Sequence, residues 1–305
     1  MLKVLAALFV VFLSACQTAP PARPAATEPP PVVVTPPVVV APPKPPARPP
    51  RIGLALGGGA ARGFAHIGVI QVLEESGIRP EMVAGTSAGS LVAALYASGK
   101  SGTEMASLAL GMDEGAITDW SFPTRGLIRG EALARYVREH TGGRPIEQLP
   151  LPLGIVATDL DTGLAVLFQR GDTGSAVRAS SAVPAVFQPV RIGTREYVDG
   201  GLVSPVPVRF ARQMGAELVV AVDISLPPDG NPTTDVMKML LQTFAIMGRS
   251  INQFELRDAD VVLRPLLAGV SSADFTARKR AIQAGRDAAL AVLPALRARI
   301  AALTR

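Results

Sequence analysis

The chain has 305 residues, of which 48% are hydrophobic and only 18% are charged, so intrinsic disorder is excluded for the sequence as a whole. The formal net charge is +5, a basic excess that suits an anionic partner. Cys16 is the sole cysteine, which excludes an internal disulfide.

The first fifteen residues have the layout of a secretory signal peptide. Lys3 gives a basic start, an apolar run too short to span a bilayer extends from Val4 to Leu13, and small residues precede Cys16. The sequence Leu13-Ser14-Ala15-Cys16 resembles the lipobox of bacterial lipoproteins, in which the cysteine is acylated. We therefore predict a lipoprotein signal peptide over residues 1–15 and lipidation of Cys16, with an ordinary cleaved signal as the alternative.

Residues 16–50 are predicted to be a tether. Half of the 28 prolines lie between Pro20 and Pro50, and because proline fixes φ and lacks an N–H, the segment should be extended and polyproline-like. A docking site for a proline-recognising partner is the alternative. Gln17 resembles the sorting pattern of outer-membrane lipoproteins, so we expect the protein at the outer membrane, facing the periplasm. An exported chain meets little nucleic acid, and anionic lipid is then the expected partner of the basic excess.

Residues 51–305 are predicted to form an α/β domain with a mostly parallel central sheet flanked by helices, because short β-branched runs alternate with helical patterns. The predicted strands are Ile52–Leu56, Glu81–Ala84, Leu153–Thr158, Leu164–Gln169, a segment ending at Asp199, Glu217–Ile224 and Val261–Leu263. The predicted helices run from Phe64 to Gly77, through Leu91 to Gly99, near Ser175–Ser181 and along the C-terminal stretch, whose arginines are expected to form a solvated face. Residues 101–143 are expected to be mainly helical, with a break at 120–130, and to cap the site.

Gly57, Gly58 and Gly59 lie between the first strand and the first helix and present backbone N–H groups that can hold an anion. A dinucleotide-binding loop would need a third glycine where Arg62 stands, and no phosphate-binding G-K-[ST] follows. An oxyanion hole, with Arg62 pinning the loop or adding positive charge, fits this sequence better.

Gly85-x-Ser87-x-Gly89 lies between a strand and a helix, which is the context of a nucleophile turn. Small neighbours allow the sharp bend, and the helix amino end stabilises negative charge developing nearby. The alternative is a small-residue turn in which Ser87 only caps the helix.

A nucleophilic serine needs a base. The chain offers two histidines, His66 within a predicted helix and His140 near a helix end, and neither is well placed on sequence grounds. Asp199 stands out among the carboxylates because it follows a strand and precedes Gly200-Gly201, which permits a tight turn; burial would have to raise its basicity. The alternative is a simple Asp-Gly turn without a catalytic role. Two distant histidines and one cysteine give no metal-ligand cluster, so we expect no metal.

Together these motifs resemble those of the patatin-like phospholipase family, over roughly residues 51–265. The matching segments are Gly57-x-Gly59-x-x-Arg62, Gly85-x-Ser87-x-Gly89, Asp199-Gly200-Gly201 and the run from Ala179 to Val190. The resemblance implies a Ser87–Asp199 dyad with no histidine, a sheet flanked by helices related to the three-layer α/β hydrolases, lipid ester substrates and no cofactor.

The sequence therefore predicts a lipid acyl hydrolase of the phospholipase A or lysophospholipase kind. Ser87 would attack the ester carbonyl, Asp199 would take its proton, and the Gly58 and Gly59 amides would hold the oxyanion. One alternative is a carboxylesterase or thioesterase acting on small substrates. Another is a non-catalytic envelope-tethered protein that binds lipid or a partner.

Overall fold

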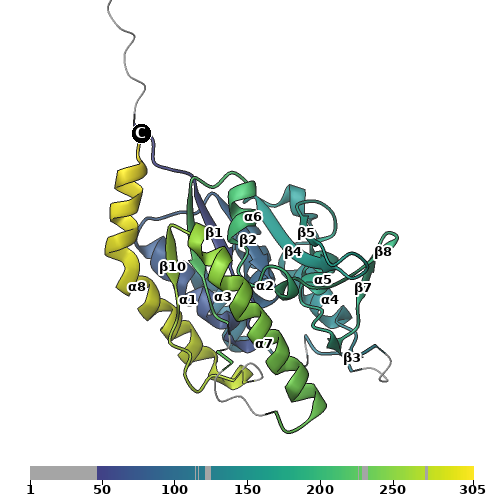
Figure 1. The fold of residues 1–305 in the computed structure, drawn as a ribbon. Helices are drawn as coiled ribbons and strands as arrows, with labels where there is room; N and C mark the ends of the chain where they lie inside the picture. Colours follow the sequence, from purple (N-terminus) through teal and green to yellow (C-terminus); the bar gives the residue numbers. More distant parts are fainter. Residues whose placement is uncertain are drawn as a thin grey trace, which may run out of the picture. The chain divides into compact units, whose positions relative to one another are not determined.

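The computed structural model describes residues 47–113, 115, 117–120, 125–225, 227–228, 233–271 and 274–305. The predicted signal peptide, Cys16 and the predicted tether up to residue 46 lie outside these ranges. The described residues belong to one compact unit, Pro46–Arg305 (Figure 1).

Eight strands of the described chain form one sheet, in the order β10-β9-β1-β2-β4-β8-β7, with β5 paired to β4 off that path. The strands are β1 (Ile52–Leu56), β2 (Met82–Thr86), β4 (Leu153–Asp159), β5 (Ala165–Phe168), β7 (Val190–Ile192), β8 (Arg195–Asp199), β9 (Leu218–Val222) and β10 (Val261–Leu263). Neighbours from β10 to β4 are parallel, whereas β5 and β8 run antiparallel to β4. The predicted mostly parallel sheet is confirmed.

Helices cover both faces of this sheet (Figure 1). They are α1 (Phe64–Glu75), α2 (Ala88–Ala97), α3 (Gly102–Gly111), α4 (Glu131–His140), α5 (Thr173–Ser180), α6 (Val208–Gln213), α7 (Val236–Glu255) and α8 (Arg278–Leu303). Successive side chains of a strand point to opposite faces, so Leu54 and Leu56 of β1 join the core beneath α1, α2 and α8, while Ala55 joins the core beneath α6. Both faces are buried, which explains the continuous apolar runs of the central strands.

The predicted cap region is less helical than expected. Between α3 and α4 lies a short strand, β3 (Gly126–Ile128), which pairs in parallel with β6 (Ala185–Phe187) as a separate two-stranded sheet. Residues 114, 116 and 121–124 of the region lie outside the described ranges. The helices α6 and α7 were not predicted from the sequence.

The late arginines are more than a solvated face. Arg286 of α8 forms a two-point ion pair with Glu75 of α1, with distances of 2.7 and 2.9 Å, and Arg299 binds Asp260 next to β10. These contacts fix α8 against both the helical layer and the sheet edge.

The arrangement around β4 positions the site. Thr86, the last residue of β2, is paired with Val156, while Asp199, the last residue of β8, is paired with Ala157. Some of the β4 residues that pair with β2, and some of those that pair with β8, also pair with β5. Since β5 occupies one edge of β4, β2 and β8 must both lie along the other edge. They approach along that edge from opposite directions, and their carboxyl ends therefore meet.

Candidate active site

Ser87 lies on a strained turn between β2 and α2. Its backbone has φ 52° and ψ −124°, a left-handed conformation that a serine adopts only when its surroundings impose it. A Cβ on Gly85 would lie 2.5 Å from the Gly89 carbonyl oxygen, and one on Gly89 would lie 2.1 Å from that of Leu56. Both glycines are therefore required for α2 to pack against the strands so closely.

The Ser87 hydroxyl donates a hydrogen bond to Asp199, with 2.6 Å between Oγ and Oδ2. The other carboxylate oxygen accepts from the Gly201 amide at 2.7 Å. A Cβ on Gly200 would lie 2.2 Å from the Val156 carbonyl oxygen, so the turn after Asp199 can approach β4 only with glycine there. The structure thus brings together two residues that are 112 positions apart.

Asp199 is only 6% exposed, and this burial raises its pKa from 3.8 to about 6. The hydrogen bonds from Ser87 and Gly201 act in the opposite direction but are outweighed. At neutral pH the carboxylate is largely ionised, yet it is far more basic than an exposed aspartate. A pKa near the working pH suits a general base.

The glycine loop lies directly beside Ser87, because a Cβ on Gly58 would be 3.1 Å from Ser87 Cβ. The Gly57 amide donates to the Val222 carbonyl and the Gly58 amide to that of Pro205. The Gly58 amide was expected to hold the oxyanion, but it donates instead to the backbone carbonyl of Pro205, in the segment between β8 and α6. Within the described part of the chain, the Gly59 amide donates no hydrogen bond, so it is the amide of the three left for an anion.

Arg62 does not contact the Ser87–Asp199 pair. Its side chain is 3% exposed and lines a cavity of about 880 Å³ together with Asp223 and Ile224. Burial lowers the pKa of Arg62 to about 10, and the Asp223 charge opposes that shift. Of the two roles expected for Arg62, pinning the glycine loop or adding positive charge at the oxyanion, the second does not fit its place beside Asp223.

The two histidines lie elsewhere. His66 is fully buried, which lowers its pKa to about 4, so the neutral ring donates through Nε2 to the Gly57 carbonyl, 2.8 Å away. It supports the glycine loop. His140 packs edge-on against Tyr136 at the end of α4. Among the residues that the structure describes, no group of three or more His, Cys, Asp or Glu side chains is placed to hold a metal ion.

Sequence reasoning missed several residues that hold the pair in place. The hydroxyl of Ser180, in α5, accepts from the Ser87 amide at 2.9 Å and donates to the Val156 carbonyl at 2.5 Å. Thr158 donates to the carbonyl of Asp199. The run beginning at Ala179 had pointed to this region, but only the tertiary packing shows which hydroxyl serves the turn.

The fold and this arrangement place the chain among α/β proteins that carry a serine on a strand-to-helix turn beside a buried carboxylate. The family model of the patatin-like phospholipases matches residues 54–212, which is half of the chain. The chain belongs to that family.

Relatives with similar sequences agree with this assignment, and one solved structure shares the fold. An NTE family protein of Mycobacterium tuberculosis is 41% identical over 179 residues, which are 58% of this chain and 49% of that protein. Patatin-like phospholipase domain-containing protein 6 of Mus musculus is 33% identical over 57% of this chain and 13% of its own length. The chain thus spans at most about half the length of these relatives. VipD from Legionella pneumophila shares the fold, with a TM-score of 0.54 at 16% identity over 82% of this chain and 68% of VipD.

Proposed function

We propose that the chain is a lipid acyl hydrolase that cleaves carboxylic esters of phospholipids or lysophospholipids through an acyl-serine intermediate. The observation that carries this proposal is the 2.6 Å hydrogen bond from the Ser87 hydroxyl, on its strained turn, to the buried Asp199 carboxylate. Membership of the patatin-like phospholipase family and the similarity to phospholipase-domain relatives support an ester in a lipid as the substrate.

In the first half-reaction, Ser87 Oγ attacks the ester carbonyl carbon while Asp199 Oδ2 accepts the hydroxyl proton. Negative charge moves to the carbonyl oxygen, where the Gly59 amide and the amino end of α2 stabilise it. The bond between the carbonyl carbon and the alcohol oxygen then breaks. Asp199 returns the proton to that oxygen, and the lysolipid or alcohol leaves the acyl-Ser87 enzyme.

In the second half-reaction, water takes the place of the alcohol. Asp199 accepts a proton from the water as its oxygen attacks the acyl carbon, and the proton then passes to Ser87 Oγ as the acyl bond breaks. A fatty acid and the free serine result. A carboxyl with a pKa of about 6 both accepts and returns a proton readily near neutral pH.

The test uses mixed phospholipid micelles and identifies the released products by mass. We expect wild type to release fatty acid and lysolipid, and Ser87→Ala and Asp199→Asn to be slower by about 10³-fold or more. Asp159→Asn is the matched control, because Asp159 is a buried carboxylate at the end of β4 that binds Arg195 rather than Ser87. A fluorophosphonate should label wild type and not Ser87→Ala; folded wild type that resists labelling would favour a non-catalytic binding protein.

Substrate size separates the lipid hydrolase from a small-substrate esterase. For a lipid hydrolase, kcat/KM should rise as the acyl chain of the ester lengthens, because the longer chain buries more apolar surface. A rate that falls with chain length would indicate a carboxylesterase or thioesterase using the same two residues.

We also propose that the protein is exported and lipid-anchored to the outer membrane through Cys16. This rests on the resemblance of Leu13-Ser14-Ala15-Cys16 to a lipobox and on Gln17 after it. Cys16→Ser should move the protein from the membrane fraction to the soluble fraction of the producing cell. Retention of the variant in the membrane fraction would argue against this anchor.

A further inference from the structure

Arg62 is a buried cation without a hydrogen-bond partner. Its side chain is 3% exposed, yet among the residues that the structure describes no oxygen accepts a hydrogen bond from its guanidinium, and Nε is enclosed without an acceptor. Burial of an ionised group without hydrogen bonds is unfavourable. With a pKa of about 10, the guanidinium still carries its charge at neutral pH. This position suits an anion that enters the cavity which Arg62 lines.

Asp223 does not supply that anion. Its Oδ1 accepts hydrogen bonds from the amide and the hydroxyl of Ser225, and its Oδ2 lies 3.4 Å from Nε of Arg264 in an ion pair. The Ser225 hydroxyl, whose proton goes to Asp223, accepts in turn from Nδ2 of Asn252 at 2.9 Å. Both oxygens of the carboxylate are therefore occupied, and the charge of Asp223 acts on Arg62 only without contact.

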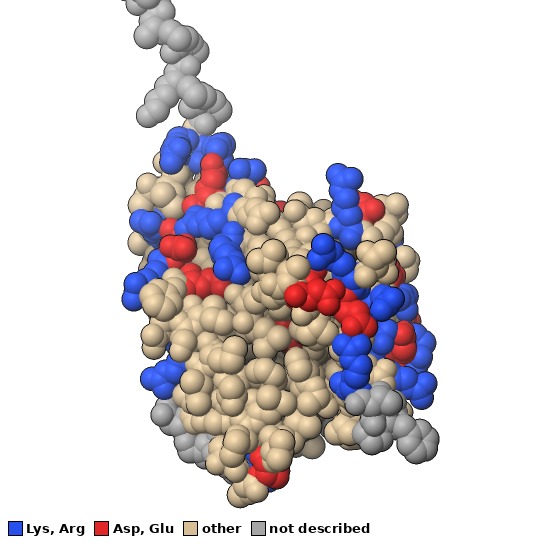
Figure 2. Space-filling model, turned by 45° about the vertical axis from the view of Figure 1, so that its right-hand side comes forward, with Lys and Arg blue, Asp and Glu red and all other residues tan. Residues whose placement is uncertain are grey.

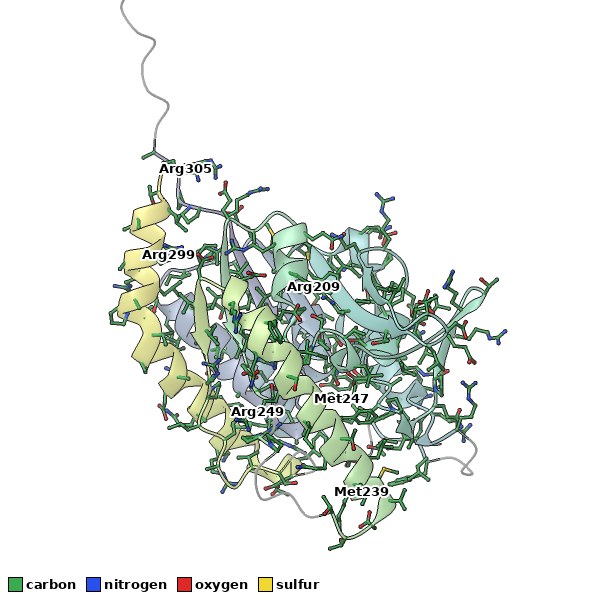
Figure 3. All side chains as sticks on the ribbon, viewed as in Figure 1. Arg209, Met239, Met247, Arg249, Arg299 and Arg305 are labelled. Carbon is green, nitrogen blue, oxygen red and sulfur yellow. The ribbon has the colours of Figure 1, made fainter. Side chains whose placement is uncertain are left out.

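The other cations that line the cavity have partners. Arg264 is paired with Asp223, and Arg249, which Figure 3 shows on α7, also takes part in an interaction. Among the described arginines of the cavity, the cation without a contacting partner is thus Arg62. One such cation calls for one ligand group with a single negative charge.

The rest of the cavity wall is mainly apolar. The cavity has a volume of about 880 Å³, which is within the range of pockets that hold small-molecule ligands. The helix α7 forms one wall, and Figure 2 shows a broad area without charged side chains below the charged upper part of this face of the molecule. A ligand of this cavity should therefore combine one anionic group with an apolar body. The apolar lining includes Ile224, Leu256, Pro265, Leu267 and Val270.

A carboxylate fits the cavity better than a phosphate does. The planar guanidinium matches the two oxygens of a carboxylate with two parallel hydrogen bonds. A phosphate monoester has more oxygens and up to about two negative charges, so it needs several donors. Ser225 already donates to Asp223, and Nδ2 of Asn252 to Ser225, while the charge of Asp223 disfavours a second negative charge close by.

The cavity adjoins the glycine loop. Ile224 lines the cavity and also contacts Gly59, because a Cβ on Gly59 would lie 2.8 Å from Ile224 Cδ1. Arg62 follows in the short helical turn Ala60–Gly63, and its amide donates to the Gly59 carbonyl at 3.2 Å. At Ile224, one side chain therefore separates the cavity from the backbone of the loop that is proposed to hold the oxyanion.

We propose that this cavity binds a long-chain fatty acid, with the carboxylate on Arg62 and the acyl chain against the apolar wall. The ligand is the product of the proposed reaction, since ester hydrolysis through Ser87 releases a fatty acid. The proposal deepens the proposed function and rests on it for the source of the ligand. It assigns the product a site beside the glycine loop.

The first experiment measures binding to the inert Ser87→Ala full chain, made without membranes so that Cys16 carries no lipid. Isothermal titration with dodecanoate, below its micellar concentration, should give one site per chain. Dodecanol has the same chain without the charge and should bind at least ~10-fold more weakly, and inorganic phosphate should not bind. Equal affinity for dodecanol would indicate a purely apolar cavity, and displacement of dodecanoate by phosphate would indicate a phosphate site. Either result would overturn the proposal.

The second experiment removes the cation from the Ser87→Ala chain. Arg62→Met should lower the affinity for dodecanoate at least ~10-fold and leave that for dodecanol within about twofold. Since an unpartnered buried charge is lost, the variant should unfold at no lower temperature than its parent, which verifies that it folds. Arg135→Met removes an exposed arginine of α4 and is the matched control. Parental dodecanoate affinity in Arg62→Met would refute the site.

The third experiment locates the acyl chain without changing Arg62. Ala268, exposed on the loop after β10, lines the cavity, and Trp120 is the one tryptophan of the chain. In a Trp120→Phe background, 11-bromoundecanoate should quench the emission of Ala268→Trp and not that of Ala302→Trp, which is exposed on α8. Binding of the brominated acid without quenching at Ala268→Trp would place the ligand elsewhere and overturn the proposal.

Two outcomes keep this proposal apart from the proposed function. If wild type hydrolyses no ester while Ser87→Ala binds dodecanoate through Arg62, only the proposed function fails. If wild type releases fatty acid from phospholipid while Ser87→Ala binds no dodecanoate, only the fatty-acid site fails.

Discussion

The surroundings of Asp199 disfavour the ionised form of its carboxyl group. The carboxyl is buried at the carboxyl end of β8, where desolvation outweighs the hydrogen bonds from Ser87 and Gly201 and raises the pKa to about 6. An exposed aspartate in the same place would be fully ionised but too weakly basic to take a serine proton. Burial of Asp199 therefore lowers the free energy of unfolding at neutral pH and makes the carboxylate more basic.

That cost predicts a gain in stability for Asp199→Asn. The folded pKa lies above the ordinary value of 3.8, so the native state binds the proton more tightly and its free energy of unfolding decreases as pH rises from about 4 to about 6. Asparagine has no such penalty. Asp199→Asn should raise the free energy of unfolding at pH 8 by up to about 3 kcal/mol, and the gain should disappear near pH 4. Urea denaturation at both pH values measures it.

Asp159 provides the control of opposite sign. Hydrogen bonds from the Thr162 backbone and from Arg195 lower the pKa of Asp159, so its stabilising effect is present above the ordinary value and is lost as pH falls through the folded one. Asp159→Asn should therefore destabilise the protein at pH 8. Equal changes for the two variants would contradict the burial argument for Asp199.

Ser180 should act as a positioning residue. Ser180→Ala leaves the Ser87 amide without its acceptor in a half-buried turn, which should lower the free energy of unfolding by about 1–3 kcal/mol. Because the strained turn then relaxes, kcat on a monomeric ester should fall about 10-fold to 100-fold with little change in KM. Ser181→Ala, at the neighbouring half-buried position, is the control. A proportional rise in KM with unchanged kcat would assign Ser180 to substrate binding instead.

For single residues, the sequence shows which residues form the site more readily than which partner each of their atoms binds. Ser87, Asp199 and the glycines that allow their turns could be named because motif spacing and local bends are sequence properties. The direction of the Gly58 amide depends on Pro205, and the acceptor at Ser87 depends on Ser180, 93 positions away. Such partners are determined by packing between distant segments, which motif spacing does not encode.

Among the elements, α1 and α8 cross unusually closely. A Cβ on Gly285 would lie 1.9 Å from the Ala65 carbonyl oxygen, and one on Gly68 would lie 1.9 Å from that of Ile282. The absence of a side chain at each glycine thus lets the backbone of the other helix approach closely. The ion pair from Arg286 to Glu75 lies next to this crossing and fixes its register.

This crossing predicts that Gly285→Ala destabilises the domain by about 3 kcal/mol, since overpacking against backbone cannot be relieved by a side-chain rotation. Gly111→Ala in α3 is the control, because nothing lies within 4 Å of its Cβ, and it should stabilise by roughly 0.5–1 kcal/mol. Urea midpoints measure both. A wild-type midpoint for Gly285→Ala would show that the helices tolerate a wider separation.

Local elements were predictable and long-range ones were not. The hairpin of β4 and β5 follows from two apolar runs around a turn, and it forms as expected. The pairing of β3 with β6 joins three-residue segments that are separated in sequence by α4, β4, β5 and α5, so no local pattern predicts it. The helix α7 was missed because apolar residues occupy both its buried and its outward sides, which obscures the helical period.

For the molecule as a whole, the basic excess and the burial of apolar side chains should make separable contributions to lipid binding. Attraction between surface cations and anionic headgroups is screened by salt, because the Debye length falls from about 10 Å at about 0.1 M to about 3 Å at about 1 M salt. Burial of apolar side chains in the acyl region is not weakened in this way.

Raising the salt concentration across that range should therefore reduce binding to vesicles with phosphatidylglycerol severalfold and leave a residual affinity equal to that for pure phosphatidylcholine. Hydrolysis of a monomeric uncharged ester should change little, since the Ser87–Asp199 pair is screened from solvent by burial. Co-sedimentation and initial rates measure the two quantities. An equal decline of both would mean that salt acts on the catalytic site rather than on lipid docking.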